Sequence, residues 1–150
     1  MNRSTIELKG TRELLNSINK LPFQLQKSAE VAVLRAGAKP INKAAKGKVP
    51  SDSGLLKKSL GINVAKVKGI TSARVGARKG WRSEVVRNGK KVIADPSKYS
   101  HLVEYGTSHS SAKPFIRPAV ESSQSQVLAA MAEGYDKYLD RVVKRIRSRK

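Results

Sequence analysis

The sequence predicts an α+β fold made of antiparallel strands, two long helices and a protruding basic β-hairpin. Apolar residues recur every three or four positions over 23–48 and again over about 119–147, which is helical spacing. Over 60–75 apolar and polar residues alternate, as in a pair of half-buried strands. The dipeptide Asn88-Gly89 separates two further short runs, and it is the strongest short-range signal for a β-hairpin.

Composition limits the class of protein. The 150 residues fit a single domain over 1–150, with a net charge of +20 and no cysteine. The lack of cysteine excludes a disulfide scaffold, thiolate catalysis and cysteine-ligated zinc. The start, MNRSTIELKG, has no apolar run typical of a signal peptide, and no stretch is apolar for long enough to span a bilayer. We therefore expect a protein made in a cytoplasm, with no membrane partner.

The first third of the chain predicts a short strand and two helices. Ile6 and Leu8 alternate with charged residues, which indicates a strand. Thr11 is a candidate N-cap for a helix that ends before Pro22. The next helix, Phe23–Lys48, has mostly small apolar residues, so it can lie close to a neighbouring element.

The middle of the chain predicts two hairpins. One turns at Lys68-Gly69, and the other, at about 81–95, turns at Asn88-Gly89, which places Arg87 opposite Lys90. Facing cations are unfavourable in isolation, so we expect this second hairpin to project and to meet an anionic group. Trp81 at its base is either a core anchor for the hairpin or an interface residue.

The stretch Tyr99–Glu121 is the most informative part of the chain. A short helix ends at Tyr105-Gly106, a polar loop follows, and Pro114 and Pro118 then bracket Phe115. Proline fixes its own φ near −65° and restricts the preceding residue, so the bracket holds Phe115 in one orientation. We interpret this corner as a docking site for another chain; the alternative is that Phe115 fills the core of its own chain.

Basic residues are concentrated in two places. Lys57–Lys91 holds many cations and one acid, Glu84, and the final helix, about 119–147, ends in a basic run. That helix would be about 40 Å long, more than a domain of this size can cover. Clusters of cations like these create a positive potential that attracts phosphates or an acidic protein surface. Composition alone does not show whether the partner is a nucleic acid or an acidic protein. The candidate basic contact surface comprises Arg82, Arg87, Lys90, Lys91, Arg145 and Arg147.

No motif in the sequence indicates catalysis. His101, Glu104 and His109 lack the spacing of a metal site, and no nucleophile elbow surrounds Ser108. A glycine-rich phosphate loop is also absent. We therefore expect no enzyme activity, no catalytic residue, no metal, no cofactor and no small-molecule substrate.

Three segments resemble, in the same order, the tail-completion or neck proteins of long-tailed bacteriophages. They are IELKGTRELLNSINKLP at 6–22, KGKVPSDSGLLKKSL at 46–60, and the Val-Glu-Tyr-Gly-Thr and Pro-Phe-Ile-Arg-Pro-Ala signatures within 99–121. Ser53 stands where the family usually has threonine. Residues 81–94 fall where family members vary most, so the resemblance does not cover the basic hairpin.

The resemblance implies a subunit in which a twisted antiparallel sheet packs against two long helices, and which forms a ring where the tail meets the head connector. A hexamer is favoured over a dodecamer. Rings use heterologous contacts, and charge pairs across them select the partner. Glu104 with Arg117 is the candidate charged contact, and Phe115 is the candidate aromatic anchor. The full set of candidate interface residues is Glu104, Tyr105, Phe115, Ile116, Arg117 and Trp81.

Two functions follow from these observations. The first is a structural virion protein of the phage neck, a tail-completion and head–tail joining subunit that links the tail tube to the head connector after assembly in the host cytoplasm. Its expected partners are the tail terminator, tail tube and head-connector proteins, with packaged DNA as a further contact. The alternative is a free basic nucleic-acid-binding protein. Aromatic residues are not interleaved with the cations, which argues against a reader of single strands.

Overall fold

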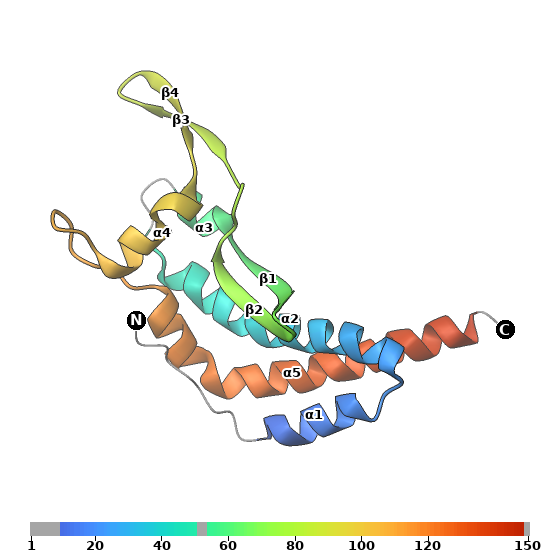
Figure 1. Cartoon of the computed structure of the whole chain (residues 1–150). Coiled ribbons are helices and arrows are strands. Elements are labelled where there is room, and N and C mark those ends of the chain that lie inside the picture. The colour runs from blue at the N-terminus through green and yellow to red at the C-terminus, as the bar shows by residue number, and fades with distance from the viewer. Residues whose placement is uncertain (1–9, 51–53, 149–150) are drawn as a thin grey trace.

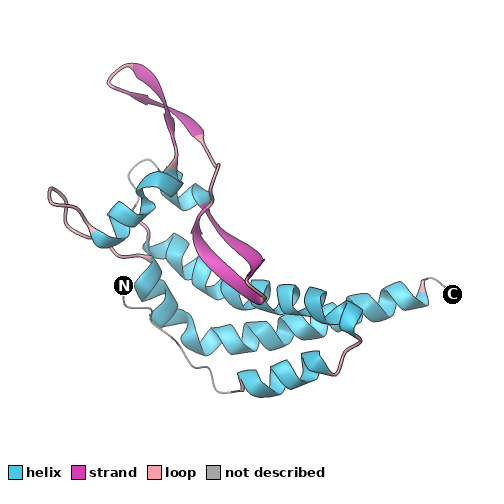
Figure 2. Ribbon diagram, in the orientation of Figure 1, coloured by secondary structure: helices cyan, strands magenta, loops and turns pink. Residues whose placement is uncertain are grey.

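The computed structural model describes residues 10–50 and 54–148. In chain order the elements are α1 (Thr11–Asn19), α2 (Phe23–Lys48), α3 (Leu55–Ser59), β1 (Leu60–Val67), β2 (Ile70–Ala77), β3 (Ser83–Arg87), β4 (Lys90–Ala94), α4 (Pro96–Tyr105) and α5 (Ile116–Arg147). The fold is therefore α+β, as predicted (Figures 1 and 2). The strand expected at Ile6–Leu8 and the turn residue Ser53 lie outside the described residues.

The two long helices, α2 and α5, lie side by side and antiparallel (Figure 1). Near the start of α2, the Tyr138 hydroxyl of α5 donates to the Leu25 carbonyl at 3.0 Å. Near the end of α2, Ala45 shares a buried cluster with Ala119 from the start of α5. Helix α1 joins this layer through Ile18, which is buried with residues of α2 and α5.

The strands form two separate two-stranded antiparallel sheets in the described part of the chain (Figure 2). β1 pairs with β2 from Leu60↔Ala77 to Val67↔Ile70, and this pair packs on α2. After β2 the Arg78 backbone N–H donates to the Ser59 carbonyl at 3.0 Å, which directs the chain back over α3. The next hairpin therefore begins away from the edge of the first one.

The second hairpin has the register that its turn predicts. Asn88 and Gly89 both have positive φ, 50° and 74°, as a two-residue turn of this kind requires. Val85 faces Val92, and Arg87 faces Lys90 across the ladder. In Figure 1 the pair β3–β4 extends away from the helical layer.

Element boundaries differ from the sequence prediction in several places, among them the start of α4, which lies at Pro96 and not at the predicted Tyr99. α5 begins at Ile116, three residues earlier than predicted, and Thr11 is the first residue of α1 while Gly10 occupies the N-cap position. The short helix α3 was not predicted; it forms because Leu55, Leu56 and Ser59 are buried together. α2 has the predicted bounds and continues through Pro40.

Candidate subunit-interface corner

The corner begins where α4 ends at Gly106. This residue has φ 77°, and a Cβ added there would lie 2.8 Å from the Ala112 backbone nitrogen, so only glycine fits without strain. The loop then returns to the helix, because the Lys113 N–H donates to the Val103 carbonyl at 2.9 Å. This return sets the start of α5 directly beside the last turn of α4.

Glu104 in that last turn caps the start of α5. Its carboxylate accepts backbone hydrogen bonds from Phe115 at 2.7 Å, Ile116 at 2.9 Å and Arg117 at 3.0 Å. The first four N–H groups of a helix have no partner within the helix. Three of them point at Glu104, and the fourth position is Pro118, which has no N–H. A carboxylate also suits the positive end of the helix dipole.

This cap is a different contact from the charged one that the sequence suggested between Glu104 and Arg117, within or between subunits; a contact between subunits stays a prediction. The two residues are joined through the Arg117 backbone, and no ion pair between their side chains occurs within 10–50 and 54–148. The sequence did contain a signal for the cap. The residue at the N-cap position is Phe115, whose side chain cannot accept a hydrogen bond, which leaves the helix end open to an acceptor from elsewhere in the chain.

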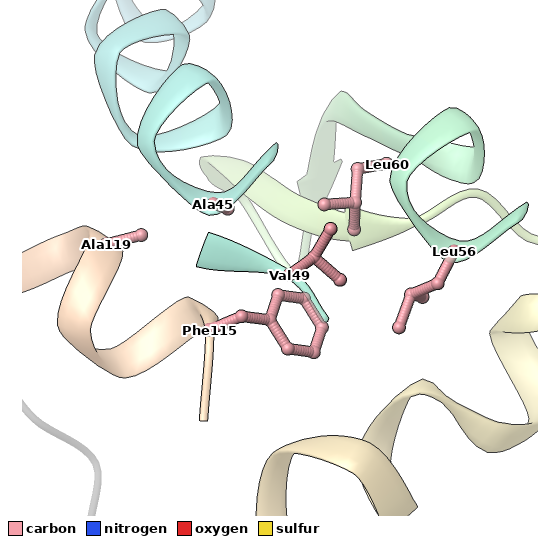
Figure 3. Close-up of a cluster of buried hydrophobic side chains, with 6 residues drawn as sticks. All are labelled: Ala45, Val49, Leu56, Leu60, Phe115 and Ala119. Atoms are coloured by element: carbon pink, nitrogen blue, oxygen red, sulfur yellow. The ribbon is translucent and has the colours of Figure 1, made fainter. Parts of the chain in front are cut away.

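Phe115 fills the core of its own chain. Its side chain is 1% exposed and lies in a cluster with Ala45, Val49, Leu56, Leu60 and Ala119 (Figure 3). This is the alternative that the sequence left open. Because the phenyl group of Phe115 is almost fully buried, it has almost no surface to offer to a partner chain. Any effect of Phe115 on an interface would act through the elements that it positions. The interface role itself stays a prediction.

Five of the six candidate interface residues line one groove. The groove has a volume of about 490 Å³ and lies between β2, α4 and α5; Glu104, Tyr105, Phe115, Ile116 and Arg117 all contribute to it. Glu104 is 7% exposed, whereas Tyr105 is 68% exposed and Arg117 is also exposed. The buried residues Glu104 and Phe115 therefore support the groove. The exposed residues Tyr105 and Arg117 are accessible to a partner.

The sixth candidate, Trp81, lies elsewhere. It is half-buried in the link between β2 and β3, and its backbone N–H donates to the Arg78 carbonyl at 3.2 Å. Trp81 does not line the groove of the other five residues.

The candidate basic residues lie on two distant surfaces. On the hairpin side Arg82 pairs with Asp95 at 3.8 Å and Lys91 pairs with Glu84 at 2.9 Å, while Lys90 is exposed at the turn. Arg145 and Arg147 belong to the last turns of α5, at the opposite end of the molecule (Figure 1). The two basic runs that the sequence shows therefore stay apart in the fold.

The described residues contain neither a metal-binding cluster nor a membrane-spanning helix. Among them, no group of three or more histidine, aspartate or glutamate side chains is placed to hold a metal ion. Within the same residues, no helix combines the length and the apolar character that crossing a bilayer requires.

A family model matches residues 12–106, which is more than half of the chain. That model is described as "Bacteriophage HK97-gp10, putative tail-component". The matched region includes α1 to α4 and ends at Gly106, so the start of α5 lies beyond it. No curated protein and no solved structure is similar enough to the chain to match it.

Proposed function

The chain belongs to the HK97-gp10-like family of bacteriophage tail components, and from this premise we propose that it is a ring-forming, tail-completion subunit of the phage neck. A tail component is a part of the virion and meets other tail or head proteins. In the proposal this subunit links the tail tube to the head connector, and its role is structural, with no chemical step.

The observation that carries the proposal is the groove between β2, α4 and α5. It is built on a rigid support, because Glu104 holds the start of α5 through three backbone hydrogen bonds. The groove also carries two exposed side chains, Tyr105 and Arg117. Tyrosine and arginine are enriched among the residues that contribute most to binding at the centres of interfaces. A ring requires one patch to meet a different patch on the next copy, and a groove suits such a contact. A hexamer remains favoured over a dodecamer.

The test is the mass of the particle that the 16.4 kDa chain forms alone and with its tail-tube and head-connector proteins. We expect a discrete ring, six copies in the favoured case, measured by native mass spectrometry. The double variant Tyr105→Ala/Arg117→Ala should keep the fold, since both side chains are exposed, but should shift the chain to monomer and fail to enter virions.

A matched control removes an exposed apolar residue and an exposed cation far from the groove. Lys66→Ala/Ile70→Ala at the β1–β2 turn should assemble as the wild type does. The proposal fails if the wild-type chain stays monomeric with its neighbours present and is absent from purified virions. If Tyr105→Ala/Arg117→Ala assembles as well as Lys66→Ala/Ile70→Ala, the groove is not the subunit interface.

A further inference from the structure

A second groove, between α2 and the last third of α5, collects cations that are far apart in the sequence. Its volume is about 770 Å³. Six basic side chains line it, against one lining acid, Asp140; they are Arg35, Lys39, Lys137, Arg141, Lys144 and Arg145. Four belong to α5 and two to α2, so the groove exists only when the two helices pack.

Most of these cations are free to meet an external anion. Lys137 forms an ion pair with Glu133, and Lys39 also acts on Glu133, where these contacts lower the pKa of its carboxyl. In the part of the chain that the structure describes, no ion pair involves Arg35, Arg141, Lys144 or Arg145. An excess of positive charge is therefore left in the groove, and all six cations are exposed to solvent.

We infer that this groove binds the phosphate backbone of duplex DNA. Arg35 and Lys39 are four residues apart on α2, and Lys137 and Arg141 are four apart on α5, which sets about 5–6 Å between successive side chains on each helix. Two such rows face one another across the groove. Their long aliphatic stems can lie along its apolar floor while the charged ends reach outward. Such an arrangement binds charge along a strand without reading bases.

The groove suits a duplex better than a single strand. Proteins that bind single strands stack bases on aromatic side chains. The one aromatic residue lining this groove is Tyr138, which is buried and whose hydroxyl is bonded to Leu25. An acidic protein segment is the competing ligand, and the test below separates the two. The inference does not depend on ring formation.

The experiment measures binding of the full chain to a fluorescent 20-base-pair duplex as salt is raised. If the four unpaired cations each meet a phosphate, the plot of log affinity against log salt should have a slope of about −4. In the variant Arg35→Gln/Lys144→Gln/Arg145→Gln the slope should become shallower by about 3. Exposed glutamines should leave the thermal unfolding midpoint unchanged.

The control variant is Lys66→Gln/Arg74→Gln/Lys79→Gln, which removes three exposed cations away from the groove and should keep the slope of the wild type. Equal changes in both variants would mean a diffuse positive field and would overturn the inference, as would binding that does not respond to salt. A groove variant that binds DNA normally but no longer binds poly-glutamate would assign the groove to an acidic protein and would equally overturn it. Particle mass, measured on the same samples, reports ring formation separately.

Discussion

At the scale of single residues, Glu104 is the group on which the candidate site depends. One side chain satisfies every available N–H at the start of α5, a helix of 32 residues. Glu104 is buried, and its partners are three backbone donors. The position of Glu104 therefore sets where α5 begins, which way Phe115 points into the core, and where Arg117 meets solvent.

Replacing Glu104 should destabilise the protein. Glu104→Ala leaves the Phe115, Ile116 and Arg117 donors without a partner, and we expect a loss of about 2–4 kcal/mol in the free energy of unfolding. Glu104→Gln keeps one acceptor oxygen and should lose less, about 1 kcal/mol. Urea titration followed by circular dichroism measures both.

Glu121→Gln is the matched control, because this acid is exposed on the same helix; it should change the unfolding free energy by less than about 0.5 kcal/mol. If Glu104→Ala were as stable as the wild type, the three hydrogen bonds would not hold the helix in place.

At the scale of elements, α2 and α5 approach each other closely at two glycines. A Cβ at Gly134 of α5 would lie 2.4 Å from the Ala36 Cβ of α2, and a Cβ at Gly37 of α2 would lie 2.5 Å from the Met131 side chain. The small residues predicted for α2 therefore serve a close antiparallel crossing. That crossing also brings the cations of α2 and α5 into one groove.

Gly134→Ala should separate the helices. The added methyl group has no space, and we expect a loss of about 1–3 kcal/mol, although alanine favours helix by about 1 kcal/mol. Adding Ala36→Gly should recover part of the loss, with a favourable coupling of about 1 kcal/mol in a double-mutant cycle. Chemical denaturation of the four proteins gives this coupling.

Gly47 in α2 is the control for helix propensity alone, since nothing lies within 4 Å of a Cβ added there. Gly47→Ala should stabilise the protein by up to about 1 kcal/mol. A stabilising Gly134→Ala would contradict the close crossing.

The start of α4 carries a pH-dependent contact. Asp95 is its N-cap, and the hydrogen bond from the Ser97 hydroxyl, at 2.6 Å, is the main cause that lowers the Asp95 pKa below its ordinary value of 3.8. Because the folded pKa lies below the unfolded one, this contact stabilises the fold above the unfolded value and is lost as pH falls through the folded value.

Ser97→Ala should therefore destabilise the protein at pH 7, and its difference from the wild type should shrink as the pH falls below about 4. Thermal unfolding at a series of pH values measures this difference. Ser108→Ala, at an exposed loop position, should match the wild type throughout. A difference that did not depend on pH would assign the effect of Ser97 to something other than Asp95.

At the scale of the whole molecule, the described chain has a helical layer that carries the first hairpin, and a second hairpin that stands apart (Figure 1). The two proposed surfaces lie at different places on the helical layer. The groove with Tyr105 and Arg117 is at the start of α5, and the cationic groove is along its last third. Under the two proposals, α5 contacts a neighbouring subunit near its start and DNA along its last third.

Removing the second hairpin should leave the rest folded. β3 and β4 pack mainly against each other, so replacing residues 83–94 by a short Gly-Ser link should change the unfolding free energy by only about 1 kcal/mol. Far-ultraviolet circular dichroism should keep its helical signal, with a cooperative thermal transition. An unfolded product would mean that the hairpin is part of the core.

The amino-acid sequence alone predicts the elements whose signals are local. Helical periodicity predicted α2 with its observed bounds, the turn at Lys68-Gly69 predicted the first hairpin, and the turn at Asn88-Gly89 predicted the second hairpin with its register. The family resemblance was equally readable, because it depends on short ordered segments. Each of these signals comes from residues only a few positions apart. Over such short separations the backbone geometry of a helix, strand or turn fixes how the residues lie relative to one another.

Only the tertiary structure decided which residues share a site. It placed Phe115 inside the core, joined Glu104 to the backbone of α5, and brought Arg35 near Arg145 although 110 positions separate them in the sequence. Spacing along a chain carries no record of such contacts. They arise from burial and from the close crossing of two helices, which are properties of the packed molecule.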